Sequence, residues 1–569
     1  LWRNELPGIL RVLENYPRIG LAISCRTSYE RIVIPEGLIP ESMTQVNHRG
    51  FADHEYIATT TFFNHYGIER PNIPLLVPEF SNPLFLKIFC QGLAKRHLTR
   101  IPRGLKGVTA IFDFFIDAVH ETLWHRLDYD PSANLAQKAV NLIARRMAET
   151  GQPWVERADA STLVNSLLPG RSYQQSLFAN LLNEGLLSED LVYLTAKSDG
   201  NDIQRIDIVK FPYERFSDHL IVRHLLDTHL DTSNPATSFT PTQPLGNLVT
   251  DASQAWSNSG WIEALSVQVP EKTGLELVEL VSSIKSWDIT QRAFLQSLIW
   301  RDLTKITEAT KDYLNEVYIE GDSIEEVYDL MLIIAAEPEH PFNAKFLHQH
   351  LIRLDMPDRD QVWSIYLAQN YDQEGAIDRL LEWAWDSEKS HISDDSIELC
   401  AIALTWFLTT SHRYVRDRAT KALVSMLYSR PHILLNLIEH FSEVNDLYVT
   451  ERLCAVSYGV SMMSDSSEAI GELASKVYKW IFSDGEPPVH ILLRDYALGV
   501  IETANYREAL LPDVDIEKAR PPYQADWLTN IPSEDELKAS GKLSASGRDF
   551  AGGGRTAIKH SVMGFGDFA

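Results

Sequence analysis

Residues 203–226 pass from the period of a β-strand to the period of a helix within a few positions, and this change constrains the fold more than any other feature. Apolar and polar side chains alternate from Ile203 to Val209, which is the two-residue period of a strand. Pro212 ends the alternation, because proline cannot donate a hydrogen bond to a neighbouring strand. Apolar residues then recur at helical spacing, at Phe216, Leu220, Ile221 and Leu225. We therefore predict a strand, a short turn and an amphipathic helix in that order.

A further helix is predicted just upstream, at 174–182. The order of helix, extended wing and helix is typical of a winged-helix domain, which we place at 132–232. A winged helix that reads DNA presents a helix rich in Lys and Arg to the major groove. The sequence of this segment predicts no such helix, and the chain carries a net charge of −26. We therefore expect that this domain does not bind nucleic acid.

The acidic charge is concentrated in one part of the chain. Residues 1–120 contain 13 Lys/Arg and 11 Asp/Glu, a net charge of +2, whereas residues 311–400 contain 6 and 21, a net charge of −15. Cations bind phosphate backbones, so the acidic part repels nucleic acid. Its acidic residues form either an ordinary solvated surface or a docking face for a basic protein. Both interpretations stay open at this point.

The length and the apolar pattern place the chain among multidomain proteins outside the membrane. At 569 residues the chain is too long for one core and predicts three or four units. No apolar run reaches the roughly 18 residues that a membrane span needs, and no signal segment opens the chain, so we expect a cytoplasmic protein. The cysteines are far apart and form no CxxC pair, which favours buried thiols over a metal site or a disulfide at Cys25, Cys90, Cys400 and Cys454.

An apolar segment near the start predicts a strand that is buried on both faces. A helix is predicted at 2–16, Pro17 ends it, and six of the eight residues from Ile19 to Arg26 are apolar or Gly. Arg26 stands at the carboxyl end of this strand, where open α/β sheets bind ligands. A salt bridge at the end of the strand is the alternative interpretation of Arg26.

Several helices are predicted after this strand. Asp53 is predicted to cap a helix over 53–66. Pro83 fits the first turn of another helix, where its missing N–H costs nothing, and Asn82 is predicted to cap that helix. Further helices are predicted at 108–127, 133–149 and 160–168.

Three short phrases carry a resemblance to a known family. They are an apolar strand followed by Ser-Cys-Arg-Thr at 24–27, Asn-Pro-Leu-Phe-Leu at 82–86 and Tyr-Glu-Arg-Phe-Ser-Asp-His at 213–219. Together they resemble the STAND-class (NACHT-like) P-loop NTPases, in particular the bacterial antiviral (Avs) group. The resemblance implies that Arg26 senses the γ-phosphate during catalysis and that Pro83 packs on the adenine. It also implies that a winged-helix histidine contacts the β-phosphate of ADP, for which His219 is the best match and His224 the alternative. Ser81 departs from the family pattern, which often has Gly there.

The phosphate-binding loop of that family does not occur in these residues. No G-x-x-x-x-G-K-S/T motif exists, and the glycine cluster at 552–556 lacks a lysine, so we interpret it as a flexible loop. Leu1 is not Met, and we expect that the sequence is an excerpt of a longer polypeptide. The resemblance then implies ATP or ADP with Mg²⁺ as cofactors, with the phosphate-loop and Mg²⁺ ligands outside this chain. We expect no ATP hydrolysis by this excerpt alone.

Three segments of the second half align with one another, at 415–422, 449–456 and 493–500, with an acidic residue three positions into each. Their pattern and their spacings of 34 and 44 residues resemble HEAT-type repeats, which stack helical hairpins and expose surfaces for proteins. We interpret their neighbouring acids and arginines as salt bridges between repeats rather than as catalytic pairs. The Ser, Thr and Pro residues at 233–250 predict a linker.

The predicted fold is mainly α with an α/β start. It comprises the C-terminal part of a P-loop NTPase core at 1–75, a helical domain at 76–131, the winged helix at 132–232, a HEAT-like α-solenoid at 251–530 and an unassigned segment at 531–569. The predicted function is a signal-regulated STAND ATPase, whose repeats sense a foreign protein, such as a phage component, and trigger self-association in antiviral defence. The alternative is a non-enzymatic HEAT-repeat scaffold with a winged-helix protein-docking module.

Overall fold

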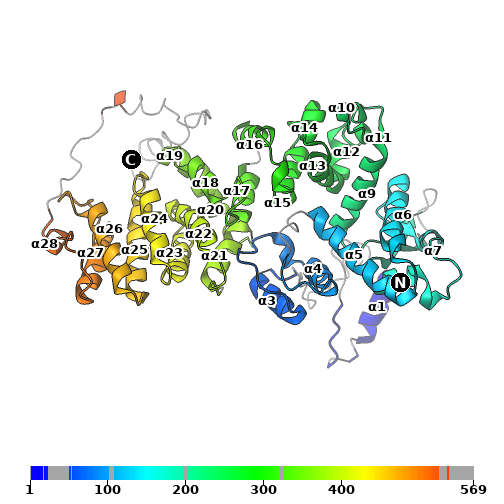
Figure 1. Ribbon diagram of the computed structural model, residues 1–569, viewed down its shortest axis with the longest axis horizontal. Coiled ribbons are helices and arrows are strands. Elements are labelled where there is room, and N and C mark those ends of the chain that lie inside the picture. The colour runs from blue at the N-terminus through cyan, green and yellow to red at the C-terminus, as the bar shows by residue number, and fades with distance from the viewer. Residues whose placement is uncertain are drawn as a thin grey trace. The chain divides into compact units, whose positions relative to one another are not determined.

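Helices make up most of the computed structural model, with one small sheet, so the prediction of a mainly α fold is confirmed (Figure 1). The chain divides into two compact units, residues 1–50 and 51–569. No helix of the described part of the chain is long and apolar enough to cross a membrane. The structure describes residues 2–13, 15–16, 18–23, 46, 50–52, 54–101, 108–195, 203–320, 324–373, 375–386, 388–523, 533 and 535–536.

The first unit contains α1 (Trp2–Leu13), which agrees with the helix predicted there. The buried strand predicted from Ile19 is wrong for the residues that the structure describes. Residues 19–23 are in no strand, and Ile19 and Leu21 are 57% and 41% exposed. A strand buried on both faces needs hydrogen-bonded neighbours, and none of the described residues of this unit lies in a strand. Arg26 lies outside the described residues.

The second unit begins with four helices that share an aromatic core. They are α3 (Glu55–Tyr66), α4 (Pro83–Lys95), α5 (Val108–Leu127) and α6 (Leu135–Thr150), with the 3₁₀ turn η2 (Pro78–Ser81) before α4. The ring of Phe80 lies edge-on to the rings of Phe85 and Phe89, each at 5.5 Å between centroids. His54 occupies the N-cap position of α3 without a side-chain hydrogen bond, and the predicted cap Asp53 lies outside the described residues.

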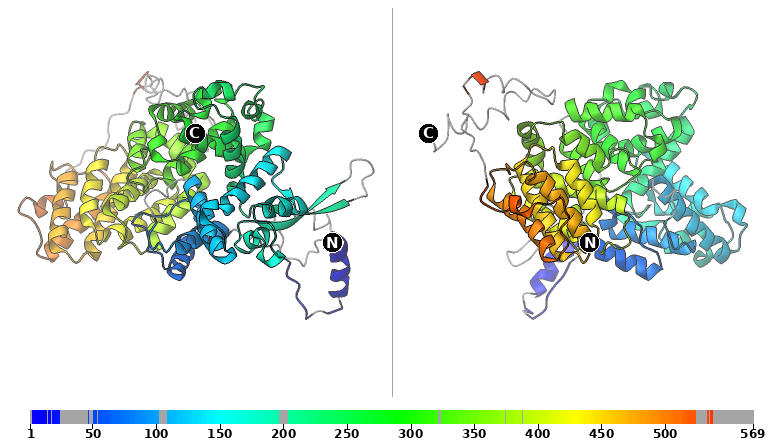
Figure 2. Two further views of the ribbon diagram at one scale, coloured as in Figure 1. Left: turned by 45° about the vertical axis from the view of Figure 1, so that its right-hand side comes forward. Right: turned by 60° about the vertical axis from the view of Figure 1, so that its left-hand side comes forward.

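The sheet is antiparallel, with the strand order β1–β3–β2. Its strands are β1 (Val155–Glu156), β2 (Ser188–Thr195) and β3 (Ile203–Lys210), so the strand predicted from Ile203 is confirmed. In the pairing register Val209 is opposite Val155 of β1 and Glu189 of β2. Helices α7 (Arg157–Asn165) and α8 (Leu177–Asn183) lie between β1 and β2 in the chain. Figure 2 shows β2 and β3 extending away from the helices as a two-stranded ribbon.

Helix α9 (Glu214–His229) follows the sheet and belongs to two hydrophobic cores at once. Phe216, Leu220 and Ile221 are buried in the core of the preceding helices and the sheet, as their spacing predicts. Val222 and Leu226 are buried in the core of the helices that follow. One helix therefore connects the two halves of this unit through packing on opposite sides.

The residues predicted as a linker at 233–250 are instead packed against the second core. They form two short helices, α10 (Pro235–Ser238) and α11 (Pro244–Asn247), and α11 contacts α9. Phe239 and Leu245 are buried because their side chains join that core, which a composition rich in Ser and Thr did not reveal. The helices that follow are α12 (Ala252–Ser257), α13 (Ser259–Thr273), α14 (Leu277–Leu280), α15 (Asp288–Trp300), α16 (Glu308–Glu320) and α17 (Ile324–Ile333).

The rest of the unit is an array of helices in two layers. In one layer α21 packs on α23, α23 on α25 and α25 on α27, and in the other α22 packs on α24 and α24 on α26. The helices are α18 (Ala344–Leu351), α19 (Met356–Arg359), α20 (Ile365–Asn370), α21 (Ala376–Asp386), α22 (Asp394–Trp406), α23 (Arg413–Leu427), α24 (Pro431–Phe441), α25 (Leu447–Met463), α26 (Ser467–Ile481), α27 (Ile491–Tyr506) and α28 (Ile516–Ala519).

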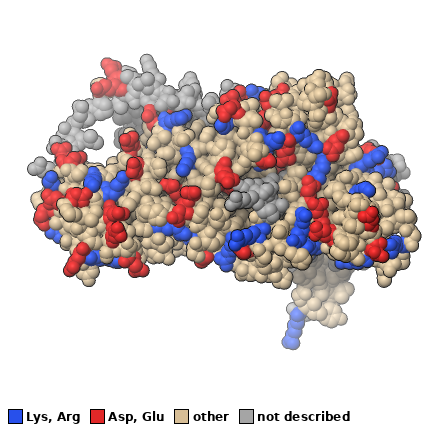
Figure 3. All heavy atoms as spheres, in the orientation of Figure 1, with Lys and Arg blue, Asp and Glu red and all other residues tan. Residues whose placement is uncertain are grey.

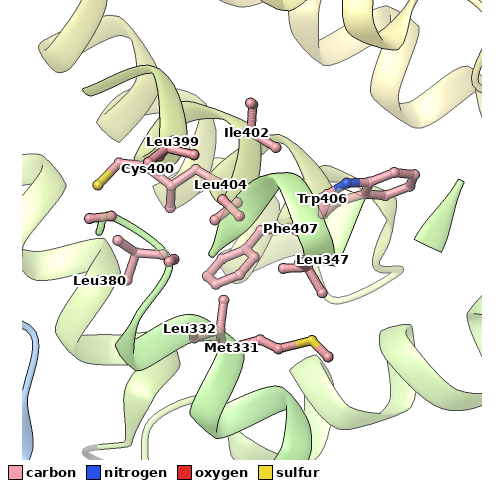
Figure 4. Close-up of a cluster of buried hydrophobic side chains, with 14 of the residues drawn as sticks. Met331, Leu332, Leu347, Leu380, Leu399, Cys400, Ile402, Leu404, Trp406 and Phe407 are labelled. Atoms are coloured by element: carbon pink, nitrogen blue, oxygen red, sulfur yellow. The ribbon is translucent and has the colours of Figure 1, made fainter. Parts of the chain in front are cut away.

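Several short 3₁₀ turns and one π-helical turn lie between these helices in the described part of the chain. The 3₁₀ turns are Pro131–Ala133, Tyr173–Gln175, Ser282–Ile284, Leu303–Lys305 and Phe407–Thr409, and Asp360–Ser364 forms a π-helical turn. Figure 4 shows part of the core of the array, to which α17, α18, α21 and α22 contribute apolar side chains. The labelled side chains are Met331, Leu332, Leu347, Leu380, Leu399, Cys400, Ile402, Leu404, Trp406 and Phe407.

The three aligned sequence segments lie on α23, α25 and α27, which are alternate helices of the array. A salt bridge predicted between repeats is confirmed: Arg452 of α25 lies 2.9 Å from Asp417 of α23. Arg418, at the position of Arg452 one helix earlier, lies 3.9 Å from Asp378 of α21. Helix α21 is a fourth member of this series that was not predicted, and its Asp378-Arg379 pair has the same pattern.

Candidate functional site

The predicted helix start at Asn82 and Pro83 is confirmed. Pro83 occupies the first turn of α4, and the Asn82 carboxamide oxygen accepts hydrogen bonds from the backbone N–H groups of Leu84 (2.9 Å) and Phe85 (3.2 Å). This arrangement satisfies two of the amide groups that a helix start leaves unpaired. The role of Pro83 against an adenine stays a prediction.

The N-terminus of α9 lies beside this helix start. The rings of Phe85 and Tyr213 are 6.0 Å apart. Arg215 is the third residue of the phrase at 213–219. It forms ion pairs with Glu79 of η2 and Glu263 of α13. Its guanidinium also lies 5.5 Å from the centroid of the Trp300 ring. The structure thus brings two of the three sequence phrases together, and Arg215 joins the phrase at 213–219 to α13.

His219 is buried between α9, α5 and α13, with 1% of its surface exposed. The Gln268 side chain of α13 donates to the His219 carbonyl at 2.8 Å, and the same amide nitrogen lies 3.3 Å from the ring atom Nδ1. The ring of Phe112 lies 5.7 Å away. Burial, with Arg215 and Arg223 nearby, lowers the pKa of His219 to about 3, so the ring is neutral.

In this conformation the face of α9 that bears His219 is not open to a ligand. Helical spacing alone leaves that face open, but α13 covers it. The alternative, His224, is half-buried near Arg145 and Glu149 of α6. Burial and the Arg145 guanidinium lower the pKa of His224. Neither histidine approaches Pro83 through a contact seen here, and Arg26 lies outside the described residues.

A hollow of about 960 Å³, partly open to solvent, lies beside the N-terminus of α9 and is lined by carboxylates. The acidic residues are Glu79, Glu214, Asp218 and Glu263, and the cations are Arg215 and Arg292. Burial, with the neighbouring Glu214 and Glu263 carboxylates, raises the pKa of Asp218 to about 7. Gly260 of α13 faces the Asp218 carboxylate so closely that a Cβ there would lie 2.1 Å from its oxygen, so any larger residue would force the carboxylate to shift.

The chemistry of this hollow does not fit nucleotide phosphates. Four carboxylates face it, and its Arg215 is already paired with two of them. An ATP or ADP phosphate group requires donors and cations rather than acceptors of the same charge. We therefore assign no nucleotide contact to the described residues of this hollow. These residues instead form ion pairs that connect η2, α9 and α13, with Arg215 bound to Glu79 and Glu263, and we call this connection the α9 joint.

A second hollow, of about 860 Å³ and also partly open, separates α3 from α21. At its edge Arg379 of α21 donates to Glu55 of α3 at 2.9 Å, repeating the pairing seen within the array. The Tyr56 hydroxyl accepts hydrogen bonds from Arg70 and from the backbone N–H of Glu388, each at 3.1 Å. This hollow belongs to the contact between the first helices of the unit and the array.

Sequence reasoning missed Glu79, Arg215, Glu263 and Gln268, which hold α9 in place. The local signal was the charged pair Arg215 and Asp218 on one face of the predicted helix. Their partners are far away in the chain, since Arg215 is separated from Glu79 by 136 positions and from Glu263 by 48. No local pattern connects residues at those distances.

The described residues form no group of His, Cys, Asp and Glu side chains that could hold a metal ion. Cys90, Cys400 and Cys454 are buried free thiols, as predicted, and burial raises the pKa of each. Cys25 lies outside the part of the chain that the structure describes. On the face drawn in Figure 3, Lys and Arg side chains are interspersed with Asp and Glu and form no continuous basic stripe.

Comparison with family models, with curated proteins and with solved structures gave no match to this chain.

Proposed function

We propose that this chain is the sensor and relay part of a signal-regulated STAND ATPase. Its parts are the end of an NTPase core at 1–75, a helical domain at 76–131, a winged helix at 132–232 and HEAT-like repeats at 251–530. The repeats bind a foreign protein in the cytoplasm, such as a phage component. Binding is transmitted to the nucleotide-dependent part of the molecule, which then self-associates in antiviral defence. The two-layer helical array and the ribbon of β2 and β3 support this assignment.

The single observation that carries the proposal is the position of α9. Its apolar side chains enter two cores, and its charged side chains reach three other elements. The ion pairs join Arg215 to Glu79 and Glu263, Arg223 to Asp113 of α5, and Asp227 to Lys272 of α13. A movement of the array relative to the preceding helices therefore has to break contacts of α9 on one side or the other.

The contacts of α9 favour two discrete arrangements of α9 and α13 over a continuous range of positions. Packed cores do not deform gradually, so a shift large enough to separate α9 from α13 replaces one set of contacts with another. Arg215 is the critical residue, because one guanidinium pairs with carboxylates from both sides of the joint. Binding on the array shifts the equilibrium only by the difference in affinity between the two arrangements.

ATP or ADP with Mg²⁺ is the cofactor that this proposal needs, and we assign none of the described residues to its phosphates. In this conformation His219 belongs to the packing of α9 on α13. A contact between His219 and ADP is part of the proposal only for an arrangement in which α13 has moved away. Control of opening is assigned to Arg215 instead.

The test compares Arg215→Met with Arg145→Met in the native protein expressed from its complete coding sequence. Arg145 pairs with Glu149 within α6 and is 61% exposed, so it provides a matched loss of one arginine outside the joint. Opening between α9 and α13 breaks the contact of Arg215 with Glu263, and one charge-assisted contact contributes about 1.5–3 kcal/mol, so Arg215→Met should raise self-association without a trigger by roughly 10- to 150-fold. Sedimentation velocity with ATP and Mg²⁺ measures this. Equal assembly by both variants, with no response to ATP or ADP, contradicts the proposal.

The second candidate is a non-enzymatic HEAT-repeat scaffold, which the acid-lined hollow favours because it offers nothing to a phosphate. In that case ADP and ATP leave the thermal unfolding temperature of the native protein unchanged, while the array still binds its partner. A ligand that binds only the folded state raises the thermal unfolding temperature. A rise in that temperature with saturating ADP therefore excludes the scaffold function.

A further inference from the structure

The two outer faces of the helical array differ in their chemistry. The layer of α22, α24 and α26 is polar, and its side chains bridge adjacent helices. His432 lies 3.0 Å from Asp394, Asn436 donates to Glu398 at 3.2 Å, and Lys476 lies 3.1 Å from Glu439. None of the large apolar side chains that are exposed belongs to these three helices, all of which the structure describes. The polar groups of this layer are occupied with one another.

The layer of α23, α25 and α27 instead exposes large apolar side chains at repeated positions. One row stands at the start of the three helices and another at their end, 14 positions later in each helix. The first row is Tyr414, Tyr448 and Leu492, which are 62%, 43% and 47% exposed, and the second is Tyr428, Met462 and Tyr506, which are 40%, 54% and 89% exposed. Leu447, Met463 and Ile491 extend the two rows.

The three helices pack closely enough to form one continuous surface. Gly459 of α25 faces Val424 of α23, where an added Cβ would lie 2.7 Å from the valine side chain. Gly499 of α27 faces the ring of Tyr458 in the same way, at 2.9 Å. The guanidinium of Arg416 lies 4.2 Å from the centroid of the Tyr448 ring and holds that ring between helices. A partner therefore meets a surface with ordered side chains rather than three separate helices.

The charge of this layer is opposite to that of the chain. Helices α23, α25 and α27 carry six Lys/Arg and four Asp/Glu, a net charge of +2, whereas α22, α24 and α26 carry two and six, a net charge of −4. The whole chain has a net charge of −26. Exposed Tyr and Met beside Arg, with few acidic residues, is the composition that protein interfaces favour.

We propose that the outer face of α23, α25 and α27 is a docking surface for an acidic polypeptide segment with apolar anchor side chains. The anchors lie on the two rows, and carboxylates of the partner meet Arg413 and Lys421, which are exposed on α23. The inference rests on the proposed protein-sensing function and names the sensing face and the chemistry of what it senses. A second copy of this chain fits less well, because two such faces placed together bring like net charges into contact.

The test uses the full chain, immobilised, and a phage-displayed library of random 16-residue peptides as the probe. Selected peptides should combine Asp or Glu with Phe, Trp, Leu or Met. A synthetic copy of the most enriched peptide is then titrated against three proteins, the wild type, Tyr448→Asp with Met462→Asp, and the control Asn436→Asp on α24. We expect the double variant to weaken binding at least tenfold, the control to change it less than twofold, and binding to weaken as salt rises.

All three positions are exposed, so the variants should fold, and thermal unfolding measures what the lost Arg416–Tyr448 and Asn436–Glu398 contacts cost. Three outcomes overturn the proposal. They are selection of Lys- and Arg-rich peptides, binding that is unchanged in the double variant, and concentration-dependent self-association that the double variant abolishes. The experiment contains no nucleotide, so its failure leaves the α9 joint untouched. A failure of the Arg215→Met test likewise leaves this surface untouched.

Discussion

Arg452 of α25 pairs with Asp417 of α23 at 2.9 Å, and the two residues occupy adjacent positions of the same repeated motif on consecutive helices of one layer. The same relationship recurs between Arg418 of α23 and Asp378 of α21. Arg452 and Arg418 each pair with an acidic residue of the helix that precedes theirs in the layer, whereas Arg379 of α21 pairs with Glu55 of α3, outside the layer. The series stops at α27, where Tyr496 stands at the arginine position.

The first prediction separates these partly exposed pairs from a buried one. Asp417→Asn should lower the free energy of unfolding by about 0.2–1 kcal/mol, because the Asp417 carboxylate is 40% exposed and solvent screens its pair with Arg452. Arg359→Met should cost about 3–5 kcal/mol, because it leaves Asp446 as an unpaired carboxylate that is 4% exposed. Urea unfolding followed by circular dichroism measures both. Equal midpoints for the two variants contradict the distinction.

The second prediction concerns two glycines of the array with different neighbours. An alanine Cβ at Gly471 would lie 2.4 Å from the backbone oxygen of Ala509, which has little room to move. At Gly499 the neighbour is the Tyr458 ring, which can shift. Gly471→Ala should therefore destabilise by about 1–3 kcal/mol. Gly499→Ala should be close to neutral, because alanine gains about 1 kcal/mol in helix propensity. Thermal unfolding checks the order, and a larger loss for Gly499→Ala would contradict it.

The third prediction is a pH dependence at Asp218. Burial raises its pKa from 3.8 to about 7, so the folded chain binds a proton that the unfolded chain has lost. The contribution of Asp218 to the free energy of unfolding is fully present below pH 4. It is lost as the pH rises to about 7, because the buried carboxyl group then has to ionise. Asp218→Asn removes that loss, so the variant should gain stability over the wild type between pH 4 and 7, by at most about 4 kcal/mol. The gain should be constant above pH 8.

His219 supplies the control of opposite sign. Its pKa falls from 6.5 to about 3, so the unfolded chain binds the proton first and stability is lost as pH falls below 6.5. The advantage of His219→Gln over the wild type should therefore grow as pH drops from 6.5 to 4, whereas that of Asp218→Asn shrinks. Urea unfolding at matched pH values measures both differences. Parallel curves for the two variants rule out these assignments.

The fourth prediction tests the contact that covers His219. Gln268 donates to the His219 carbonyl at 2.8 Å in a buried position, so Gln268→Leu removes that hydrogen bond at similar volume. We expect a loss of about 1–3 kcal/mol and faster hydrogen exchange at the amides of α9. Gln254→Leu is the matched control, since Gln254 lies on the exposed side of α12. Equal exchange rates in both variants would show that α13 does not hold α9.

Local periods predicted the elements well where the period was strong. The strand from Ile203, the turn at Pro212 and the helix through Phe216 were correct because neighbouring residues alone determine an alternation or a helical face. The start of α4 was correct for the same reason, since Asn82 caps groups two and three positions away. The repeats on α23, α25 and α27 were found because they recur in the chain.

The errors arose where distant contacts decided the outcome. Phe239 and Leu245 lie in a segment whose composition predicts a linker, yet the core around α9 offers them a place to bury apolar area. Ile19 and Leu21 have the composition of a buried strand, yet no described residue of their unit provides the neighbouring strand. In both segments the composition alone does not indicate whether another part of the chain packs against these apolar side chains.

The sequence by itself determined the helical class, the strand before α9, the cap of α4 and the register of the repeats, because each depends on residues within one or two turns or on recurrence along the chain. Only the tertiary structure decided that α13 covers His219, that Arg215 joins Glu79 to Glu263, and that one face of the array is apolar while the other is polar. Burial and charge pairing depend on which surfaces meet, and the two partners of Arg215 lie 48 and 136 positions away in the chain.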